Sequence, residues 1–217
     1  MHSRNMANNQ ATEEIRGEWQ RIERWMALHA PAWLDPHGLH PLFNPPVPEG
    51  ELIRVEGHLH HTLPDQFKAL LLTHNGCQRG EYPLPMRAMK PTKWRIISVD
   101  EVVEEWDLLC SISVSEPFTH SVRTVGPVQS VWWSHSWIPI AECGMGDVVC
   151  MDMRPAQGGP TGQLILYEHD FEERKVLYPS LLNWLRECVD DLENGEYVYI
   201  YGLGIYHKDE LIDGEIR

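Results

Sequence analysis

The spacing of apolar residues predicts a helix near the start of the chain. In residues 12–30 an apolar side chain recurs at every third or fourth position, which is the pattern of a helix with one buried face. The residues on this face are Ile15, Trp19, Ile22 and Met26. Thr12 is suited to cap the first turn and Pro31 cannot extend the last one, so we expect the helix to lie between them.

The following segments predict a loop and two shorter helices. Six prolines between Pro31 and Pro48 disfavour regular structure and predict a loop that wraps over the core. Residues 51–59 place apolar side chains on one helical face, and residues 63–76 do the same. Pro64 is suited to the first position of the latter helix, and an Asn-Gly pair is suited to its end.

The middle of the chain predicts a short strand from Trp94 that turns into a helix ending near Cys110. Ser98 and Glu101 have the spacing of a capping box, in which each side chain accepts a hydrogen bond from the other residue's backbone N–H. The side chains expected to face inward from this helix are Val102, Val103, Trp106 and Leu109.

The second half of the chain predicts strands around one strong helix. The strand-like runs are 130–134, 147–153 and 162–170. The last two are nearly continuous in apolar residues, which indicates central strands covered on both faces. Residues 179–195 carry the clearest amphipathic pattern of the chain, and residues 196–203 predict a final strand. Helices that precede strands in this order are typical of an α+β domain rather than a βαβ repeat.

Length and composition fit one well-packed domain. The chain has 217 residues, 42% of them hydrophobic, and its nine tryptophans lie largely in periodic segments. The first fourteen residues lack the apolar core of a signal peptide, and no apolar run reaches membrane-spanning length. Five scattered cysteines make a poor disulfide framework. We therefore expect a cytoplasmic protein in a reducing compartment.

The charge of the chain narrows the class of partner. The 32 acids and 18 bases give a formal charge of -14, which repels nucleic acid and anionic membrane surfaces and would attract a basic protein. Nine acids and one base lie between Glu187 and Glu215, and five acids without a base lie between Asp100 and Asp107. These acids are either the solvated faces of two helices or a docking surface for a basic partner.

The polar residues of the sequence give little support for catalysis or for metal binding. Cys143 and Cys150 have histidines nearby in sequence, but buried structural thiols are common and inert. A small hydrolase would use Asp147, Asp152, His169 or Asp170. The histidines His58, His60 and His61 are clustered at the end of a predicted helix, where their side chains would point in several directions. The glycine loops at 143–147 and 158–163 match no phosphate-binding motif and predict turns between strands. We expect no catalysis, cofactor or dedicated metal site.

Five sequence segments together resemble one family. They are WQRIERWMALHAP, FKALLLTHNG, VWWSHSWIPIAECGMGDVVCMDMRP, GGPTGQLILYEHD and VLYPSLLNWLRECVDDLENGEY. In this order they resemble the SUKH superfamily, and most closely its branch named after the fungal Smi/Knr cell-wall-assembly regulators. The resemblance covers most of the chain, from about Trp19 to Tyr199. It implies a single α+β domain at 12–201 with a twisted, largely antiparallel sheet flanked by helices. Residues 1–11 would be disordered and 202–217 an acidic tail.

The resemblance also implies roles for particular residues. Those expected to hold the fold are Trp25, Trp137, Pro139, Gly144, Gly146, Asp147, Gly162, His169, Asp170 and Trp184. Bacterial members resemble immunity proteins, so we expect a protein that neutralises a cognate protein toxin encoded beside it, a basic nuclease-type toxin being suited to the charge. The alternative is a regulatory interaction module with an endogenous partner, as in the fungal branch. The candidate contact residues are Asp100, Glu101, Glu104, Glu105, Asp107, Trp133, Asp190, Asp191, Glu193, Glu196 and Tyr201.

Overall fold

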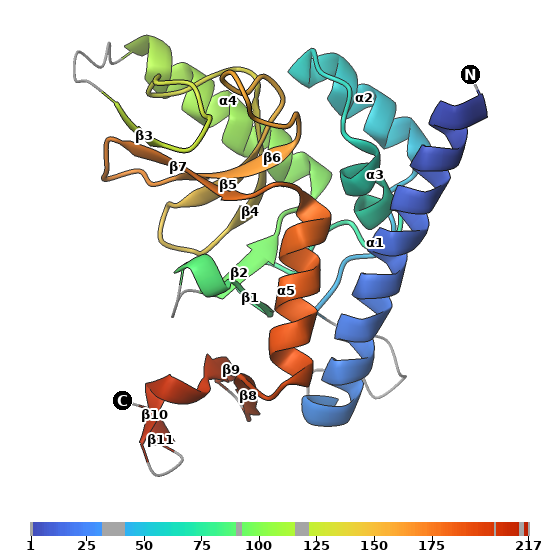
Figure 1. Ribbon diagram of the computed structural model, residues 1–217. Coiled ribbons are helices and arrows are strands. Elements are labelled where there is room, and N and C mark those ends of the chain that lie inside the picture. Colours follow the sequence, from blue (N-terminus) through green and yellow to red (C-terminus); the bar gives the residue numbers. More distant parts are fainter. Residues whose placement is uncertain are drawn as a thin grey trace.

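The computed structural model describes residues 2–31, 42–89, 93–115, 122–201, 203–212 and 215–216 (Figure 1). The five α-helices of this part are α1 (His2–His29), α2 (Glu49–Leu59), α3 (Asp65–Leu71), α4 (Val99–Ser115) and α5 (Leu181–Glu193). Helix α1 begins within the segment 1–11 for which disorder was predicted, so Thr12 lies inside the helix and is not its N-cap. Most of the proline-rich loop, at 32–41, lies outside the described residues.

One seven-stranded sheet forms the centre of the molecule. Its strands in spatial order are β1 (Leu84–Pro85), β2 (Lys93–Ile96), β4 (Trp137–Glu142), β5 (Val148–Asp152), β6 (Gln163–Tyr167), β7 (Glu173–Tyr178) and β3 (Arg123–Val125). All pairs are antiparallel except β3 with β7. Every residue of β5 and β6 is buried, which confirms that these two apolar runs are central strands. The α+β class with a largely antiparallel sheet is confirmed.

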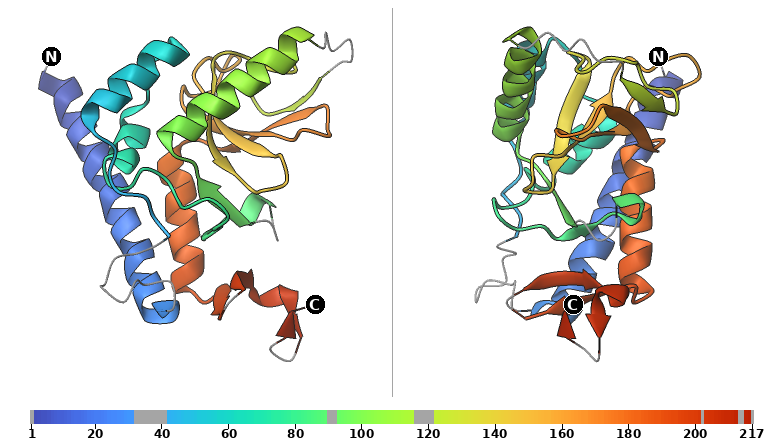
Figure 2. Two further views of the ribbon diagram at one scale, coloured as in Figure 1. Left: turned by 180° about the vertical axis from the view of Figure 1, so that it is seen from behind. Right: turned by 90° about the vertical axis from the view of Figure 1, so that its left-hand side faces the viewer.

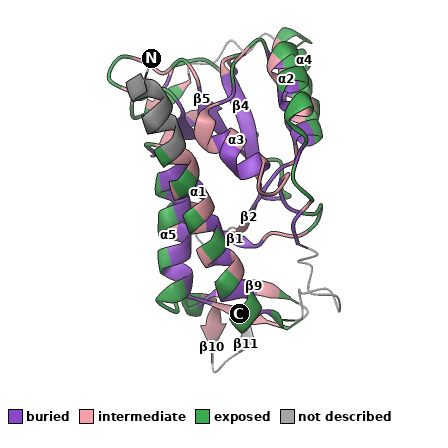
Figure 3. Cartoon of the chain, turned by 90° about the vertical axis from the view of Figure 1, so that its right-hand side faces the viewer, coloured by how far each residue is buried: buried purple, intermediate pink, exposed green. Residues whose placement is uncertain are grey.

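Helices cover the sheet on both sides. Figure 2 shows α4 on one face of the sheet and α5, with α1 beside it, on the other. Helix α2 packs on α4, while α1 packs on both α3 and α5. Figure 3 shows that the buried surface of β4, β5 and α3 lies between helices whose outer faces are exposed. The apolar stripes read from the sequence are therefore the faces that meet in one continuous core.

The predicted strand at 130–134 is wrong, because this segment is held by a contact from a distant part of the chain. Residues 130–132 form bends, residues 133 and 134 are irregular, and strand β4 begins only at Trp137. The backbone carbonyl of Trp132 accepts hydrogen bonds at 3.1 and 2.9 Å from the side chain of Arg174. Because a side chain takes this acceptor, it is not used in a strand ladder, and the apolar side chain of Trp133 reaches the core from a loop.

The C-terminal segment, predicted to be an acidic tail outside the domain, is folded where the structure describes it. Strands β8 (Tyr197–Ile200) and β9 (Gly204–His207) form a hairpin separate from the main sheet. A 3-10 turn at Lys208–Glu210 follows, capped by the side chain of His207, and β10 (Leu211–Ile212) pairs with β11 (Glu215–Ile216). The strand predicted at 196–203 is thus present, but it belongs to this hairpin.

Candidate functional site

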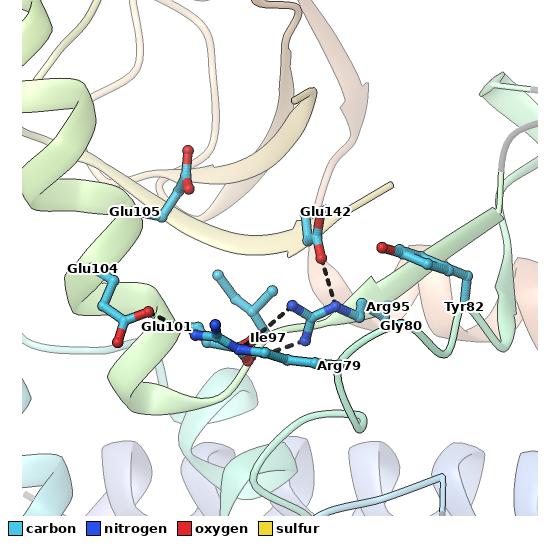
Figure 4. A pocket seen from close by; sticks show the side chains of 9 residues that line it. All are labelled: Arg79, Gly80, Tyr82, Arg95, Ile97, Glu101, Glu104, Glu105 and Glu142. Atoms are coloured by element: carbon cyan, nitrogen blue, oxygen red, sulfur yellow. Dashed lines mark hydrogen bonds and ion pairs between the residues drawn. The ribbon is translucent and has the colours of Figure 1, made fainter. Parts of the chain in front are cut away.

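A charged pocket of about 390 Å³ opens where α4 begins beside the sheet (Figure 4). Its walls come from the first turns of α4, the ends of β2 and β4, and the loop before β1. The lining residues are Arg79, Gly80, Tyr82, Arg95, Ile97, Glu101, Glu104, Glu105 and Glu142. Four carboxylates and two guanidinium groups therefore share one cavity, together with one aromatic ring.

Arg95 forms the floor of the pocket and is only 5% exposed. The register of β2 and β4 places it opposite Glu142, whose Oε1 accepts a hydrogen bond from Arg95 Nε at 2.6 Å. Its two Nη atoms donate to the two carboxylate oxygens of Glu101 at 3.0 and 2.7 Å. This fork-to-fork geometry is what allows a guanidinium to be buried, because each charge is paired and hydrogen-bonded.

Glu101 joins the pocket to the start of helix α4. Its Oε2 accepts the backbone N–H of Ser98 at 2.8 Å, and its own N–H donates to Ser98 Oγ at 3.4 Å, so the predicted capping box is confirmed. Burial opposes ionisation of this carboxyl, but the hydrogen bonds from Arg95 and from Ser98 outweigh burial and lower the pKa of Glu101 to about 2. The group is a carboxylate at any physiological pH.

Arg79 crosses the mouth of the pocket from the loop before β1. Its Nε donates to Glu101 Oε1 at 2.6 Å and its Nη2 donates to Glu104 Oε2 at 2.7 Å. The side chain is 69% exposed. Exposed ion pairs of this kind are worth little because water and salt compete for both charges. Arg79 is therefore a rim residue that a stronger ligand of the same carboxylates can displace.

Glu105 is the unpaired acid of the pocket. No hydrogen bond or ion pair joins its side chain to any other described residue, and the side chain is half-buried. Burial, followed by the charge of Glu142, raises the pKa of Glu105. Since Arg95 and Arg79 are engaged by Glu101, Glu104 and Glu142, the excess negative charge of the cavity lies on the side of Glu105.

The turn between β4 and β5 closes one wall of the pocket. Gly144 has φ +77°, and a Cβ built on it would lie 2.3 Å from the hydroxyl oxygen of Tyr82. Its backbone N–H donates to Glu142 Oε2 at 2.8 Å. Glycine at this position therefore lets the Tyr82 ring close against the turn and holds the Glu142 carboxylate in place. Met145, at the tip of the same turn, is 63% exposed.

Three of the four residues considered for a hydrolase do converge beside this turn. Asp147 Oδ1 accepts hydrogen bonds from the backbone N–H of His169 at 3.2 Å and lies 2.9 Å from His169 Nδ1. The other ring nitrogen lies 3.2 Å from Asp170 Oδ2. The Asp147 hydrogen bond, with the charge of Asp170, raises the pKa of His169. Because both ring nitrogens face carboxylates, this group clamps two turns together.

Asp152 is not part of that convergence. It ends β5, while Asp147 precedes the strand, and its Oδ2 accepts a hydrogen bond from Gln163 Nε2 at 3.1 Å. Cys150 lies between them with no exposed surface, and burial raises the pKa of its thiol well above the ordinary value. Such a thiol is not an activated nucleophile.

The histidine cluster is dispersed by the end of α2. His58 Nε2 lies 2.8 Å from Asp107 Oδ1 on α4, whereas His60 adopts a left-handed conformation with φ 54° beyond the helix. Across the described ranges no group of three or more His, Cys, Asp or Glu side chains is arranged to hold a metal ion. Within the same ranges no helix combines the length and the hydrophobicity needed to cross a membrane.

The predicted acidic contact residues lie mainly on two helices, α4 and α5, and each helix carries both buried and exposed acids. Glu101 and Asp191 are buried and ion-paired, the latter with Arg87, so neither faces a partner freely. The acids with exposed side chains are Asp100, Glu104 and Asp107 on α4, and Asp190 and Glu193 on α5. Glu196 pairs with Lys208 in the C-terminal hairpin. Since α4 and α5 cover different faces of the sheet, the structure does not bring the acids of the two helices together (Figure 2).

The two predicted aromatic anchors lie in opposite environments. Trp133 is buried, packs edge-to-face on Trp137 and Tyr167, and donates its Nε1–H to Cys110 Sγ at 3.3 Å. The expectation that it is a surface anchor is therefore corrected, because its ring completes the core. Tyr201, at the tip of the C-terminal hairpin, is 82% exposed and remains a candidate contact.

The other motif residues lie where they can support the fold. Trp25, Trp137 and Trp184 are buried, and Trp184 Nε1 donates to the carbonyl of Pro85 at 3.1 Å. Pro139 is buried in β4 next to a register shift, where the ladder is already irregular. The glycines Gly146 and Gly162 have φ +93° and +85°, so both occupy a region that other residues rarely adopt.

Sequence reasoning missed the pocket residues Arg79, Tyr82, Arg95 and Glu142. A signal was present for two of them, because Arg95 lies within the apolar run of β2 and Glu142 directly follows the apolar run of β4. A charged residue inside a buried strand needs a partner of opposite charge. The register that joins these two residues could not be read from one sequence.

Comparison with known proteins identifies fungal relatives that are named as regulators. A protein of Schizosaccharomyces pombe named "cell wall biosynthesis/cell cycle regulator smi1" is 25% identical over 83% of this chain and 36% of its own length. The "glucan synthesis regulatory protein" of Neurospora crassa is 22% identical over 84% of this chain and 39% of its length. The Saccharomyces cerevisiae "cell wall assembly regulator SMI1" is 20% identical over 89% and 43%. The chain thus spans less than half the length of these relatives.

These relatives overturn the leading functional prediction. They are fungal proteins named as regulators, so the expectation of a bacterial immunity protein with a toxin encoded beside it is wrong. The motifs misled because residues that hold a fold indicate the fold and do not by themselves fix the function. A model of the SMI1 / KNR4 family (SUKH-1) matches residues 46–187, which is more than half of the chain. The protein therefore belongs to the SMI1 / KNR4 family (SUKH-1).

Proposed function

We propose that this chain is a regulatory protein-interaction domain that binds a protein partner at the charged pocket beside α4. The observation that carries the proposal is the pocket itself, in which four glutamates face two arginines and Glu105 has no partner among the described residues. A cavity with fixed charges and one unpaired acid is suited to recognise a complementary group on another molecule. The proposed role is binding, without turnover.

The names of the relatives support a place in the regulation of cell-wall synthesis. Three of them are called regulators of cell wall biosynthesis, glucan synthesis or cell wall assembly. The shares of their own length that this chain covers are 36%, 39% and 43%, so we assign to the domain a binding step rather than the whole activity of such a regulator.

The proposed location is the cytoplasm. All five cysteines are free thiols, and four of them, Cys77, Cys143, Cys150 and Cys188, are buried with raised pKa values. Unpaired cysteines fit a reducing compartment. The formal charge of -14 makes nucleic acid and anionic membrane surfaces poor partners and favours a basic protein.

A domain exchange tests the proposed function. In fission yeast that lacks its smi1 protein, a chimera carries this chain in place of the segment it matches. We expect the chimera to restore growth under cell-wall stress. A second chimera carries Glu104→Lys and Glu105→Lys in the pocket, and a third carries Glu13→Lys on α1, where the side chain is exposed and lines no part of the pocket.

The outcomes separate binding from simple folding. The pocket variant should fail to restore growth, whereas the Glu13→Lys chimera should restore it, and thermal unfolding of the purified chains should show that both are folded. An expressed and folded chimera that leaves growth at the level of the deletion would contradict the proposed function. Full rescue by the pocket variant would contradict the assignment of the pocket as the binding site.

A further inference from the structure

The pocket and the turn beside it point to one kind of occupant. We infer that the pocket receives an arginine side chain of a basic partner segment, with an apolar residue next to that arginine packing on Met145. This inference rests on the proposed function and adds to it the chemical class of the partner. Glu105 and Glu142 would pair with the guanidinium, and the Tyr82 ring would lie alongside it.

The two arginines of the chain that lie in the pocket show which kind of group its carboxylates bind. Arg95 is bound in bidentate fashion by Glu101, and Arg79 bridges Glu101 and Glu104 at the mouth. A guanidinium is planar, forms forked pairs with carboxylates and stacks on aromatic rings, whereas an ammonium does neither as well. A third guanidinium is matched to the remaining acid, Glu105, and to the exposed side of the cavity.

The charge balance of the lining favours a cation. Four glutamates and two arginines leave two negative charges in the cavity when all six groups are ionised. Burial and the proximity of Glu142 already disfavour the ionised form of Glu105. An incoming cation relieves both effects, because it supplies the ion pair that Glu105 lacks within the described chain. The exposed acid Asp107 on the same helix adds attraction for a basic segment.

Met145 supplies an independent, apolar part of the surface. Its chain neighbour Gly144 donates its backbone N–H to Glu142 and lies against Tyr82, and both of these residues line the pocket. The flanking glycines have φ +77° and +93°, and Gly146 lies against His169, which is held by Asp147. A large apolar side chain that is 63% exposed on a turn held at both ends is suited to contact a partner.

A titration with short peptides tests the inference. The probe is the acetylated tripeptide amide Leu-Arg-Gly, and the matched control replaces arginine by citrulline, which keeps the shape and removes the charge. Binding is followed by the backbone amide signals of the ¹⁵N-labelled chain. The arginine peptide should shift the signals of Gly80, Gly144 and Met145 with a Kd on the order of 1 mM. The citrulline peptide should leave them unchanged.

Variants of the chain locate the contact. Glu105→Gln should weaken binding about tenfold, because it removes a charge-assisted hydrogen bond. Met145→Ala should weaken it about threefold through lost apolar contact. Glu13→Gln on α1, the matched control, should bind as the natural chain does. The lysine analogue of the peptide should bind more weakly than the arginine peptide.

The inference would be overturned if the arginine peptide caused no saturable shift of the amide signals. It would also be overturned if the citrulline or lysine peptide bound as tightly as the arginine peptide, or if the Glu105→Gln variant bound the arginine peptide as tightly as the natural chain does. The growth assay with the chimeras does not depend on these peptides. Rescue by the chimera together with absent peptide binding would remove the arginine assignment and leave the proposed function standing. Failure of the folded chimera to rescue would remove the proposed function even where the arginine peptide binds.

Discussion

Two arginines are buried in the same sheet, and their surroundings differ. Arg95 on β2 meets the carboxylates of Glu101 and Glu142 on the floor of an open pocket. Arg174 on β7 has no exposed surface, and within the described chain its guanidinium meets backbone carbonyls and the ring of Tyr167, 4.2 Å away, instead of a carboxylate. Burial accordingly lowers the pKa of Arg174, while the carboxylates raise the pKa of Arg95 in spite of its burial.

The different surroundings indicate that Arg174 has a structural role, whereas Arg95 lies in a pocket that can take part in recognition. The guanidinium of Arg174 donates to the carbonyls of Trp132, Phe171 and Glu173, so it ties the loop before β4 to the turn before β7. Its donors are used inside the fold and no acid is left for a ligand. Around Arg95 the carboxylates outnumber the guanidinium groups, and the cavity is open to solvent. We therefore expect a binding site where charge is in excess and accessible.

The largest expected effect is that of Arg174→Ala. Removing this side chain leaves several buried carbonyls without a donor and opens a cavity beside Tyr167, so we expect a loss of about 4 kcal/mol in the free energy of unfolding. Urea denaturation followed by tryptophan fluorescence measures it. Arg174→Lys should recover only part of the loss, because an ammonium cannot reproduce the fork. Full stability in the lysine variant would show that charge alone is sufficient here.

Arg95→Met should lower the free energy of unfolding by about 3 kcal/mol, which is less than the loss expected for Arg174→Ala. The loss is smaller because water can reach the carboxylates that are left unpaired. The double variant Arg95→Met with Glu101→Gln should recover part of this loss, because it removes one of the two carboxylate charges with which Arg95 pairs. No such rescue is available to Arg174, which has no acid to neutralise. A double-mutant cycle in urea measures the coupling. Additive losses would mean that the two side chains do not act as a pair.

These two arginines also mark how far sequence reasoning reaches in this protein. The apolar stripes and the capping box at Ser98 were predictable because they depend on neighbours within one helix. Arg95 and Glu142 meet only through the register of β2 with β4, and Arg174 meets Trp132 from 42 positions away. Long-range pairings of this kind leave no mark in local periodicity. The pocket was missed for that reason, although the acids on α4 that line it were proposed as contacts.

The pH dependence of stability should distinguish the two arginines next. The pKa of Glu101 falls from 4.5 in the unfolded chain to about 2 in the fold. A depressed carboxyl pKa contributes stability that is complete above 4.5 and is lost as the pH falls from 4.5 towards 2. The loss caused by Arg95→Met, measured against the natural chain, should therefore shrink by about 2 kcal/mol across this window.

The loss caused by Arg174→Ala should be nearly constant over the same range, because backbone carbonyls do not titrate. Equilibrium unfolding at intervals between pH 5 and pH 2 measures both differences. Parallel curves for the two variants would contradict the assignment of Glu101 as the partner that Arg95 stabilises.

The smallest expected effect is a gain, and it concerns the acid that the pocket leaves unpaired. Because the folded pKa of Glu105 is raised, ionisation costs stability as the pH rises from the unfolded value of 4.5 through the folded one. Glu105→Gln removes this cost, so we expect the free energy of unfolding at pH 7 to rise, by less than the losses predicted for the two arginines. The control is Glu104→Gln, an exposed acid paired with Arg79 that should change stability little.

Thermal unfolding at pH 7 and at pH 4 measures the gain, which should be present at the higher pH and nearly absent at the lower one. A gain from Glu105→Gln combined with weaker peptide binding would mean that the same carboxylate weakens the fold and strengthens recognition. We expect that combination for a residue whose role is binding, because the stability of the fold alone would favour glutamine over glutamate at position 105. A loss of stability would instead make Glu105 a structural residue like Glu101. The surroundings of Arg95 and of Arg174 would then differ only in their access to solvent.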